Sequence, residues 1–157
     1  MQIIHLSEYI KNNQFFVDTI VEIQDMLSFI KKDYEHFFEW YWSTAIPKLF
    51  NNKMEFLVAI DKNNIIGILI AKKEENESKI CTLYVKEDYQ NKGVGSSLLK
   101  ESFKYLQTTK PILTFTDYKL PMFQGIIDKY DWSIDEKVYK EYNKKYEYKC
   151  NVKKYQK

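Results

Sequence analysis

The amino-acid sequence contains no arginine, because all 24 basic residues of the 157-residue chain are lysines. The chain therefore lacks the rigid guanidinium fork that binds phosphates and carboxylates in a bidentate manner. An anion bound by this protein must be held by backbone N–H groups, by helix N-termini and by lysine ammonium groups.

Glycine, proline and cysteine are also scarce, with four, three and two copies respectively. The low glycine and proline content excludes collagen-like and low-complexity chains. The two cysteines, Cys81 and Cys150, are too few for a disulfide framework. Cys81 lies in an apolar run, where a free thiol packs as a small hydrophobic side chain.

Long apolar runs and a secretion signal are absent as well. No run approaches the roughly 18 to 20 apolar residues that cross a bilayer. The N-terminal residues lack a basic region followed by a long apolar stretch and a cleavage site of small residues. We expect a soluble protein of the reducing cytoplasm, with no membrane partner and no metal site.

Aromatic residues, in contrast, are abundant at 17% of the chain, and hydrophobic residues make up 45%. This composition excludes a disordered chain, which would be poor in aromatic side chains. The length fits one domain, and a chain of this size can bury roughly two thirds of its unfolded surface in a single core. Since no internal repeat and no long linker divides the sequence, we expect a single domain over Met1–Lys157.

Charge is distributed unevenly along the chain. Residues 137–157 contain eight lysines and two acidic residues, a net charge of +6, whereas the whole chain carries only +2. A basic end on a mildly acidic body is found at nucleic-acid and membrane contacts, but it is more often a solvated face on a terminal element. We favour the solvated face.

The spacing of apolar residues predicts the secondary structure. An amphipathic helix is expected over residues 14–30, and a second, aromatic-rich helix over 34–50 that Pro47 kinks or ends. A short strand is expected at 2–6 before these helices, and polar turns separate the strands expected after them at 55–60, 65–71 and 79–85. After them the pattern predicts a helix at 93–106, a strand from 112 to 115, a helix at 121–130, and two antiparallel strands at 132–139 and up to about 152. This order of elements indicates a mixed α/β sheet with helices on both faces.

The segment with a chemical signature spans residues 79–99, where a strand is followed by a polar loop and then by a helix. Gly93 and Gly95 stand at the helix start, next to Lys92. Consecutive N–H groups at a helix start form an anion site, and glycine lets a phosphate approach the backbone closely. Ser96 and Ser97 add hydroxyl donors. With no arginine in the chain, this is the one evident site for a pyrophosphate.

Other phosphate motifs do not fit this segment. A dinucleotide fingerprint requires a third glycine where the chain has Leu98. A P-loop requires Lys-Ser or Lys-Thr after its second glycine, but Gly95 is followed by two serines. A chance Gly-x-Gly in a strand–turn–helix is the simpler alternative, and the combination of strand, glutamine, lysine, paired glycines and helix argues against it.

The run Gln90-Asn91-Lys92-Gly93-Val94-Gly95, preceded by Leu83-Tyr84-Val85, resembles the acetyl-CoA-binding motif of the GNAT N-acetyltransferase superfamily. The family pattern is Gln or Arg, two residues, Gly, one residue, then Gly or Ala. The clear match covers about residues 79–106. The resemblance implies a central mixed, mostly antiparallel twisted sheet with helices on both faces and a splay between two parallel strands.

The resemblance also implies how the cofactor is held. Backbone amides from Gln90 to Ser96 would bind the CoA pyrophosphate. Main-chain groups of Leu83 and Val85 would hold the pantetheine arm in the splay, whose other side would be the strand from Ile112. The predicted cofactor-binding residues are Leu83, Tyr84, Val85, Gln90, Asn91, Lys92, Gly93, Val94, Gly95, Ser96 and Ser97.

Two positions depart from the family pattern. Many relatives have a Glu general base at the start of the motif strand, where this chain has Lys79. Many also have a Tyr in the later helix that protonates the CoA sulfur, and a loose alignment puts Ile127 there. Tyr130 or Tyr118 could take that role, although each is a weak candidate on residue type alone.

The aromatic second helix is the expected wall for the acceptor, because the resemblance places the first helices over the substrate mouth. Glu35, His36 and Glu39 are candidates to recognise or deprotonate an amine, and Trp40 offers a ring face to a cation. For His36 a solvated or hydrogen-bonded histidine is the favoured alternative.

The leading hypothesis is an enzyme that transfers acetyl from acetyl-CoA to a primary amine by direct attack in a ternary complex. The alternative is a GNAT-fold protein that binds acyl-CoA without catalysis, motivated by Lys79 and Ile127. A third hypothesis is nucleic-acid contact through the basic end. The sequence leaves open the acceptor and the oligomeric state, including a homodimer.

Overall fold

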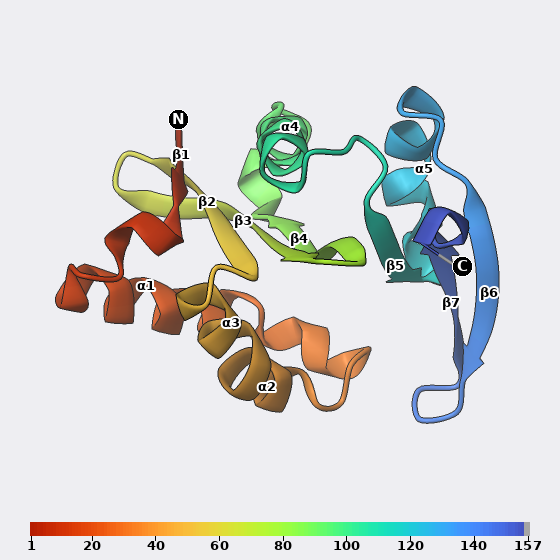
Figure 1. Cartoon of the computed structure of the whole chain (residues 1–157), viewed down its shortest axis with the longest axis horizontal. Helices are drawn as coiled ribbons and strands as arrows, with labels where there is room; N and C mark the ends of the chain where they lie inside the picture. Colours follow the sequence, from red (N-terminus) through yellow and green to blue (C-terminus); the bar gives the residue numbers. More distant parts are fainter. Residues whose placement is uncertain (156–157) are drawn as a thin grey trace.

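The computed structural model of the chain describes residues 1–155, so Lys157 of the basic C-terminal stretch lies outside the described residues. Seven strands form one sheet in the order β1-β2-β3-β4-β5-β7-β6, and all neighbours are antiparallel except β4 and β5 (Figure 1). The strands are β1 (Gln2–His5), β2 (Met54–Asp61), β3 (Asn64–Glu74), β4 (Glu77–Val85), β5 (Ile112–Thr116), β6 (Ile134–Lys140) and β7 (Lys145–Cys150). The expected mixed, mostly antiparallel sheet is confirmed.

Helices cover both faces of this sheet. On one face lie α1 (Asn13–Met26), α2 (Phe37–Trp40) and α3 (Ile46–Phe50), and on the other lies α4 (Val94–Leu106) (Figure 1). The fifth helix, α5 (Leu120–Lys129), lies on the same face of the sheet as α4 and packs against β5. Short 3-10 helices connect these elements at Leu6–Tyr9, Ser28–Lys32, Glu87–Tyr89, Asp117–Lys119 and Lys153–Tyr155.

The core consists of one hydrophobic cluster on each face of the sheet. The cluster under α1–α3 includes Leu27, Tyr41 and Phe56, which are fully buried. The cluster under α4 and α5 is built around Leu98 and Leu99. Together the two clusters cover both faces of the central strands. This explains why these strands are almost continuously apolar, as in Ile65–Ala71, since side chains on both faces are buried. The expectation of a single domain over the whole chain stays a prediction.

Pro47 does not end a helix, because the regular helix is interrupted by a wider, π-helical turn before the proline. The segment Tyr41–Ala45 is a π-helical turn between α2 and α3, and Pro47 then occupies the first turn of α3. A proline in a helix interior removes a hydrogen bond and clashes with the preceding turn, whereas the first turn tolerates it. The expected single helix over 34–50 is thus divided, and its regular part begins only at Phe37.

Strands β4 and β5 touch over only two residue pairs, Lys79 with Ile112 and Ile80 with Leu113. Beyond these pairs the strands separate. On its other side β4 carries a bulge, because Ile70 pairs with Thr82 while the next residue of β3 pairs with Ile80, which leaves Cys81 without a partner on β3. A bulge bends its strand and increases the local twist, so it helps to turn the end of β4 away from β5.

Among the described residues, every helix is too short or too polar to pass through a lipid bilayer. The same residues contain no cluster of three or more His, Cys, Asp or Glu side chains that could hold a metal ion.

Candidate active site

The start of α4 leaves its first backbone N–H groups without helical partners. Gly93 precedes the helix with φ of +86° and ψ of 0°, a left-handed conformation that strains any other residue. No side chain caps the helix, and the first bond of its ladder runs from the Ser97 N–H to the Gly93 carbonyl at 3.0 Å. The N–H groups before Ser97 therefore have no partner within the helix, and the helix dipole favours negative charge at this end.

The side chains around this helix start shape the loop that leads to it. The Gln90 side-chain amide donates to the Val85 carbonyl at 2.9 Å, and Asn91 adopts a positive φ of 61°. The Lys92 ammonium lies 6.0 Å from the Tyr89 ring centroid. Val94 is the first residue of α4 and its side chain is buried against the sheet, so only its main chain can face a ligand. Of the predicted cofactor residues, six line the cavity described below: Leu83, Tyr84, Val85, Gln90, Asn91 and Gly95. The other five, Lys92, Gly93, Val94, Ser96 and Ser97, do not.

The open edge of β4 continues from this helix start. The Lys86 N–H donates to the Ile66 carbonyl at 2.9 Å, so the main chain of Lys86 is directed toward β3. Main-chain groups alternate between the two sides of an antiparallel strand. The N–H and C=O groups of Val85 and Leu83 are therefore directed away from β3 and into the gap before β5. Tyr84 points its side chain to the α1–α3 face, where its ring centroid lies 4.9 Å from that of Phe29.

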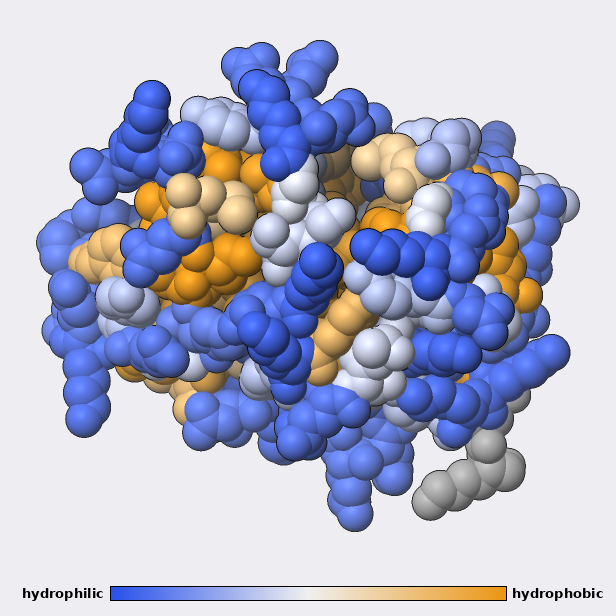
Figure 2. All heavy atoms as spheres, turned by 90° about the horizontal axis from the view of Figure 1, so that it is seen from above, coloured by the Kyte–Doolittle hydropathy of each residue, from blue (hydrophilic) through white to orange (hydrophobic). Residues whose placement is uncertain are grey.

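The gap between β4 and β5 is the floor of a cavity of about 940 Å³. Its walls come from β4, the start of α4, β5, the start of α5, the segment 29–48 and the β6–β7 turn. Figure 2, which views the molecule from the side of α4, shows apolar side chains exposed in a depression between hydrophilic ones. The cavity thus connects the start of α4 to the aromatic second helix.

The predicted acceptor residues lie at the rim of this cavity. Glu35, His36 and Trp40 line it, whereas Glu39 does not. The His36 side chain is 73% exposed, and its ring nitrogens lie 4.0 Å from a Glu35 carboxylate oxygen and 3.6 Å from one of Glu39. His36 is therefore a solvated histidine at the entrance.

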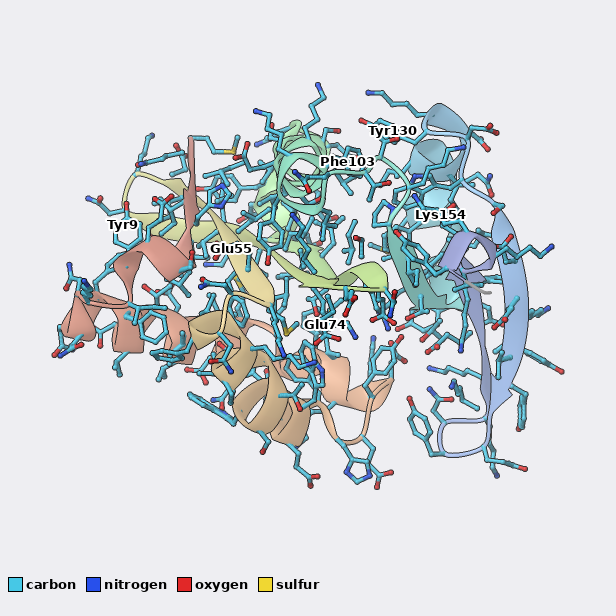
Figure 3. The ribbon with its side chains drawn as sticks, viewed as in Figure 1. Tyr9, Glu55, Glu74, Phe103, Tyr130 and Lys154 are labelled. Atoms are coloured by element: carbon cyan, nitrogen blue, oxygen red, sulfur yellow. The ribbon has the colours of Figure 1, made fainter. Side chains whose placement is uncertain are left out.

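Of the two tyrosine candidates for the general acid, only one lines the cavity. Tyr130 does not line the cavity: its ring packs against Phe103 at 4.9 Å between centroids, on the α4 side of the sheet (Figure 3). Tyr118 lines the cavity, and its hydroxyl donates to Asp33 at 2.5 Å. Burial and this contact with Asp33 raise the pKa of Tyr118 to about 12. Ile127, which the loose alignment puts at the position of the family tyrosine, is buried in the core.

Asp33 is a residue that the sequence did not single out. Its carboxylate is fully buried and lies 3.3 Å from the Lys119 ammonium and 3.4 Å from the Lys145 ammonium. Burial acts to raise the pKa of Asp33, but the Tyr118 hydrogen bond and the two ammonium groups outweigh it, so the pKa is lowered. The partners stand 85 and more residues away in the chain, so no local pattern could have revealed this cluster.

In this α/β fold, two parallel strands separate next to a helix start that follows a glycine and has no side-chain cap. Such an arrangement suits an extended ligand with an anionic group. The family model described as the acetyltransferase (GNAT) family matches residues 18–116, more than half of the chain. The chain belongs to this family, as the motif predicted.

Solved structures of low sequence identity share the fold. An aminoglycoside 6′-N-acetyltransferase complexed with coenzyme A is 11% identical, with a TM-score of 0.65 over 96% of this chain and 95% of that one. A Bacillus anthracis protein provisionally assigned as a streptothricin acetyltransferase, in complex with acetyl coenzyme A, is 15% identical, with a TM-score of 0.58 over 68% and 67%. The ribosomal-protein-S18-alanine N-acetyltransferase from Escherichia coli is 11% identical, with a TM-score of 0.52 over 66% and 73%. No curated protein sequence matches the chain.

Proposed function

We propose that this chain transfers the acetyl group of acetyl-CoA to a primary amine by direct attack in a ternary complex. The observation that carries the proposal is the uncapped start of α4, which opens onto the gap between β4 and β5. Membership of the acetyltransferase family and structural neighbours solved with coenzyme A or acetyl coenzyme A support it.

The residues at this site fit the cofactor. Backbone N–H groups from Asn91 to Ser96 receive the pyrophosphate, with Lys92 as the nearby cation and the hydroxyls of Ser96 and Ser97 as further donors. The predicted Gln90 N–H is not available, because it donates to the Glu87 carbonyl at 3.2 Å. A Cβ built on Gly93 meets no atom within 4 Å, so the space in front of the helix is open. Bound there, the cofactor supplies an activated thioester.

Main-chain groups of β4 hold the reacting end. The N–H groups of Leu83 and Val85 are directed into the gap, where they would donate to carbonyl oxygens of the pantetheine arm and of the thioester. The acceptor nitrogen attacks the carbonyl carbon, so that an N–C bond forms and the C–S bond breaks. The sulfur leaves as thiolate, and the proton of the attacking amine passes to it or to water.

Tyr118 is the general-acid candidate that lines this cavity. With a pKa of about 12, its hydroxyl stays protonated at neutral pH, and it donates its one proton to Asp33. A thiol of ordinary pKa, about 8.5, leaves as thiolate without full proton transfer. The chemistry therefore depends on positioning and main-chain donors more than on a strong side-chain acid.

The test substitutes two helical glycines, Gly95 at the site and Gly125 away from it, and measures stabilisation by acetyl-CoA. Gly95 lines the cavity in the first turn of α4, and a Cβ there meets only Val85 at 3.8 Å, an ordinary contact. Gly95→Glu places a carboxylate in the phosphate site without backbone strain. Gly125 lies exposed on α5, where a Cβ meets nothing within 4 Å, so Gly125→Glu is the matched control.

Acetyl-CoA at 100 times its Kd stabilises a protein by about 2.7 kcal/mol, or roughly 5 to 10 °C in Tm for a chain of this size. We expect wild type and Gly125→Glu to show this rise and Gly95→Glu to lose most of it. An unchanged wild-type Tm would refute cofactor binding. A full rise without thioester consumption across an amine panel would favour the alternative, a binding protein without catalysis.

A further inference from the structure

The side chains that line the cavity carry a marked excess of positive charge. Five lysines contribute to its walls, whereas Glu35 is the one acidic residue among the described lining residues, and its side chain is 68% exposed. The lysines come from three different parts of the chain: Lys32, Lys48, Lys72, Lys79 and Lys119.

Three of these lysines are neutralised by partners behind the cavity wall. Lys48 pairs with Glu74, which projects between the sheet and the helices α2 and α3 (Figure 3). Lys72 pairs with Glu77. Burial acts to lower the pKa of Lys72, but its hydrogen bond and charge interaction with Glu77 raise it instead. Lys119 pairs with the buried Asp33, as described above.

Lys32 is exposed at the rim, with its ammonium 5.6 Å from the Tyr118 ring centroid. Lys79 is different from these four. Its side chain is half-buried in the cavity wall, and within residues 1–155 no hydrogen bond or ion pair reaches its ammonium group. Its register partner on β3 is Lys72, so two like charges face each other across the strands. A half-buried charge without a partner is costly, and an anion in the cavity removes that cost.

The phosphates of the cofactor do not reach this lysine. Lys79 lies at the closed end of the β4–β5 gap, where the two strands still pair, and the anion site at α4 follows the opposite end of β4. Six residues of strand separate Lys79 from Val85, which spans about 20 Å. The anion that pairs with Lys79 therefore belongs to the second substrate.

We propose that Lys79 binds a carboxylate or phosphate group of the acceptor, so that the acceptor is a small amine that also carries an acidic group. This inference rests on the proposed acetyl transfer. The aromatic rings of Phe37 and Trp40 line the same cavity and contact the apolar part of the acceptor. A polycationic acceptor such as an aminoglycoside, which the name of one structural neighbour implies for that protein, meets lysines here instead of carboxylates.

The test measures the affinity of matched amines for the coenzyme A complex by calorimetry. The pairs are L-phenylalanine with phenethylamine, and O-phosphoethanolamine with ethanolamine; each pair shares its amine and differs in the acidic group. Kanamycin serves as the polycationic probe. We expect at least one acid-bearing member to bind about tenfold or more tightly than its partner, which corresponds to about 1.4 kcal/mol. Whether carboxylate or phosphate is preferred follows from which pair shows the difference.

Two variants assign the effect. Lys79→Met removes the charge and keeps an unbranched side chain only one atom shorter. Lys73→Met removes an equal charge from β3, on a side chain that donates to Gln107 and does not line the cavity. We expect Lys79→Met to reduce the preference to within about twofold and Lys73→Met to keep it.

Equal affinities within each pair, no detectable binding of any member, tighter binding of kanamycin, or a preference that Lys79→Met leaves intact would each overturn the inference. Failure of the proposed function is distinguishable, because in that case acetyl-CoA itself would not raise the Tm and Gly95→Glu would have no effect.

Discussion

Cys81 occupies the bulge of β4 and lines the cavity at the point where the strands part. A cysteine in this place raises the possibility of a covalent acetyl-enzyme. Burial raises the pKa of the Cys81 thiol to about 11, although nearby lysines act to lower it. Since the thiolate is the nucleophile, very little of it is present at neutral pH.

We therefore expect Cys81→Ala to retain acetyl transfer within about twofold, because direct attack by the amine needs no enzyme nucleophile. Intact-protein mass spectrometry after incubation with acetyl-CoA alone should show no adduct on wild type. An acetyl group that maps to Cys81 and disappears on addition of an amine would contradict direct transfer.

At the scale of single residues, the predicted cofactor site is local in the sequence, whereas the acid–base groups depend on residues far apart in the chain. Gly93 and Lys92 are neighbours in the chain, so the motif itself brings them together. Tyr118 and Tyr130 are both near the end of a helix or strand, and residue type does not reveal which one faces the cavity. The structure separates them, because Tyr130 packs against Phe103 while Tyr118 is directed to Asp33.

At the scale of elements, α4 and α5 have the same backbone geometry at their C-termini. The N–H of Thr108 donates to the Phe103 carbonyl at 3.3 Å, and the N–H of Trp132 donates to the Ile127 carbonyl at 2.9 Å. The residues before them, Gln107 and Asp131, have φ of 58° and 55°. Both helices thus end in a Schellman motif with a non-glycine residue in the left-handed position, where glycine is most favourable.

Replacing Asp131 by glycine should relieve this conformation. We expect Asp131→Gly to raise the free energy of unfolding by roughly 0.5 to 1 kcal/mol. The ion pair that is lost, with Lys110 at 3.8 Å, involves an aspartate that is 98% exposed and contributes little. Denaturant unfolding measures the change. Asp128→Gly, in the last helical turn of α5, is the control and should lower stability because glycine is a poor helix former; a decrease for Asp131→Gly as well would refute the strain.

The elements themselves were largely predictable from the periodicity of apolar residues. Helix α4 and strand β5 agree with the expected ranges to within one residue, and the pattern on α1 extended too far because a 3-10 turn continues its apolar spacing through Ile30. The polar turn between β2 and β3 proved tighter than its four residues suggested, with positive φ at Lys62 and Asn63. The π-helical turn before Pro47 has no signature in apolar spacing, so it was missed.

At the scale of the whole molecule, the two halves of the sheet are joined weakly along the β4–β5 seam, which has only two residue pairs. Side chains strengthen the connection from the other side of the cavity. Asp33, in the segment between α1 and α2, accepts a hydrogen bond from Tyr118, and its carbonyl accepts from Asn143 at 3.0 Å. Nearby, the Tyr34 hydroxyl donates to Glu147 on β7 at 3.1 Å. The N-terminal helices thus close the cavity against the β6–β7 hairpin.

Asp33→Asn should therefore destabilise the entire fold. We expect a decrease of about 2 to 3 kcal/mol in the free energy of unfolding at pH 7, since hydrogen bonds to a charged group are lost and two ammonium groups lose their partner. Chemical denaturation measures it, with Asp25→Asn on the exposed face of α1 as the control. Equal effects of the two substitutions would show that the Asp33 cluster does not hold the halves together.

The dependence of this difference on pH follows from the direction of the shift. The pKa of Asp33 is lower in the folded protein than its ordinary value of 3.8, so the unfolded chain binds the proton more readily. The stabilisation is complete above that ordinary value and is lost as the pH falls through the lower, folded value. The difference between wild type and Asp33→Asn should accordingly stay constant from pH 5 to 8 and shrink below about pH 4. A difference that persists unchanged at pH 2 would mean that the carboxylate acts through packing alone and not through its charge.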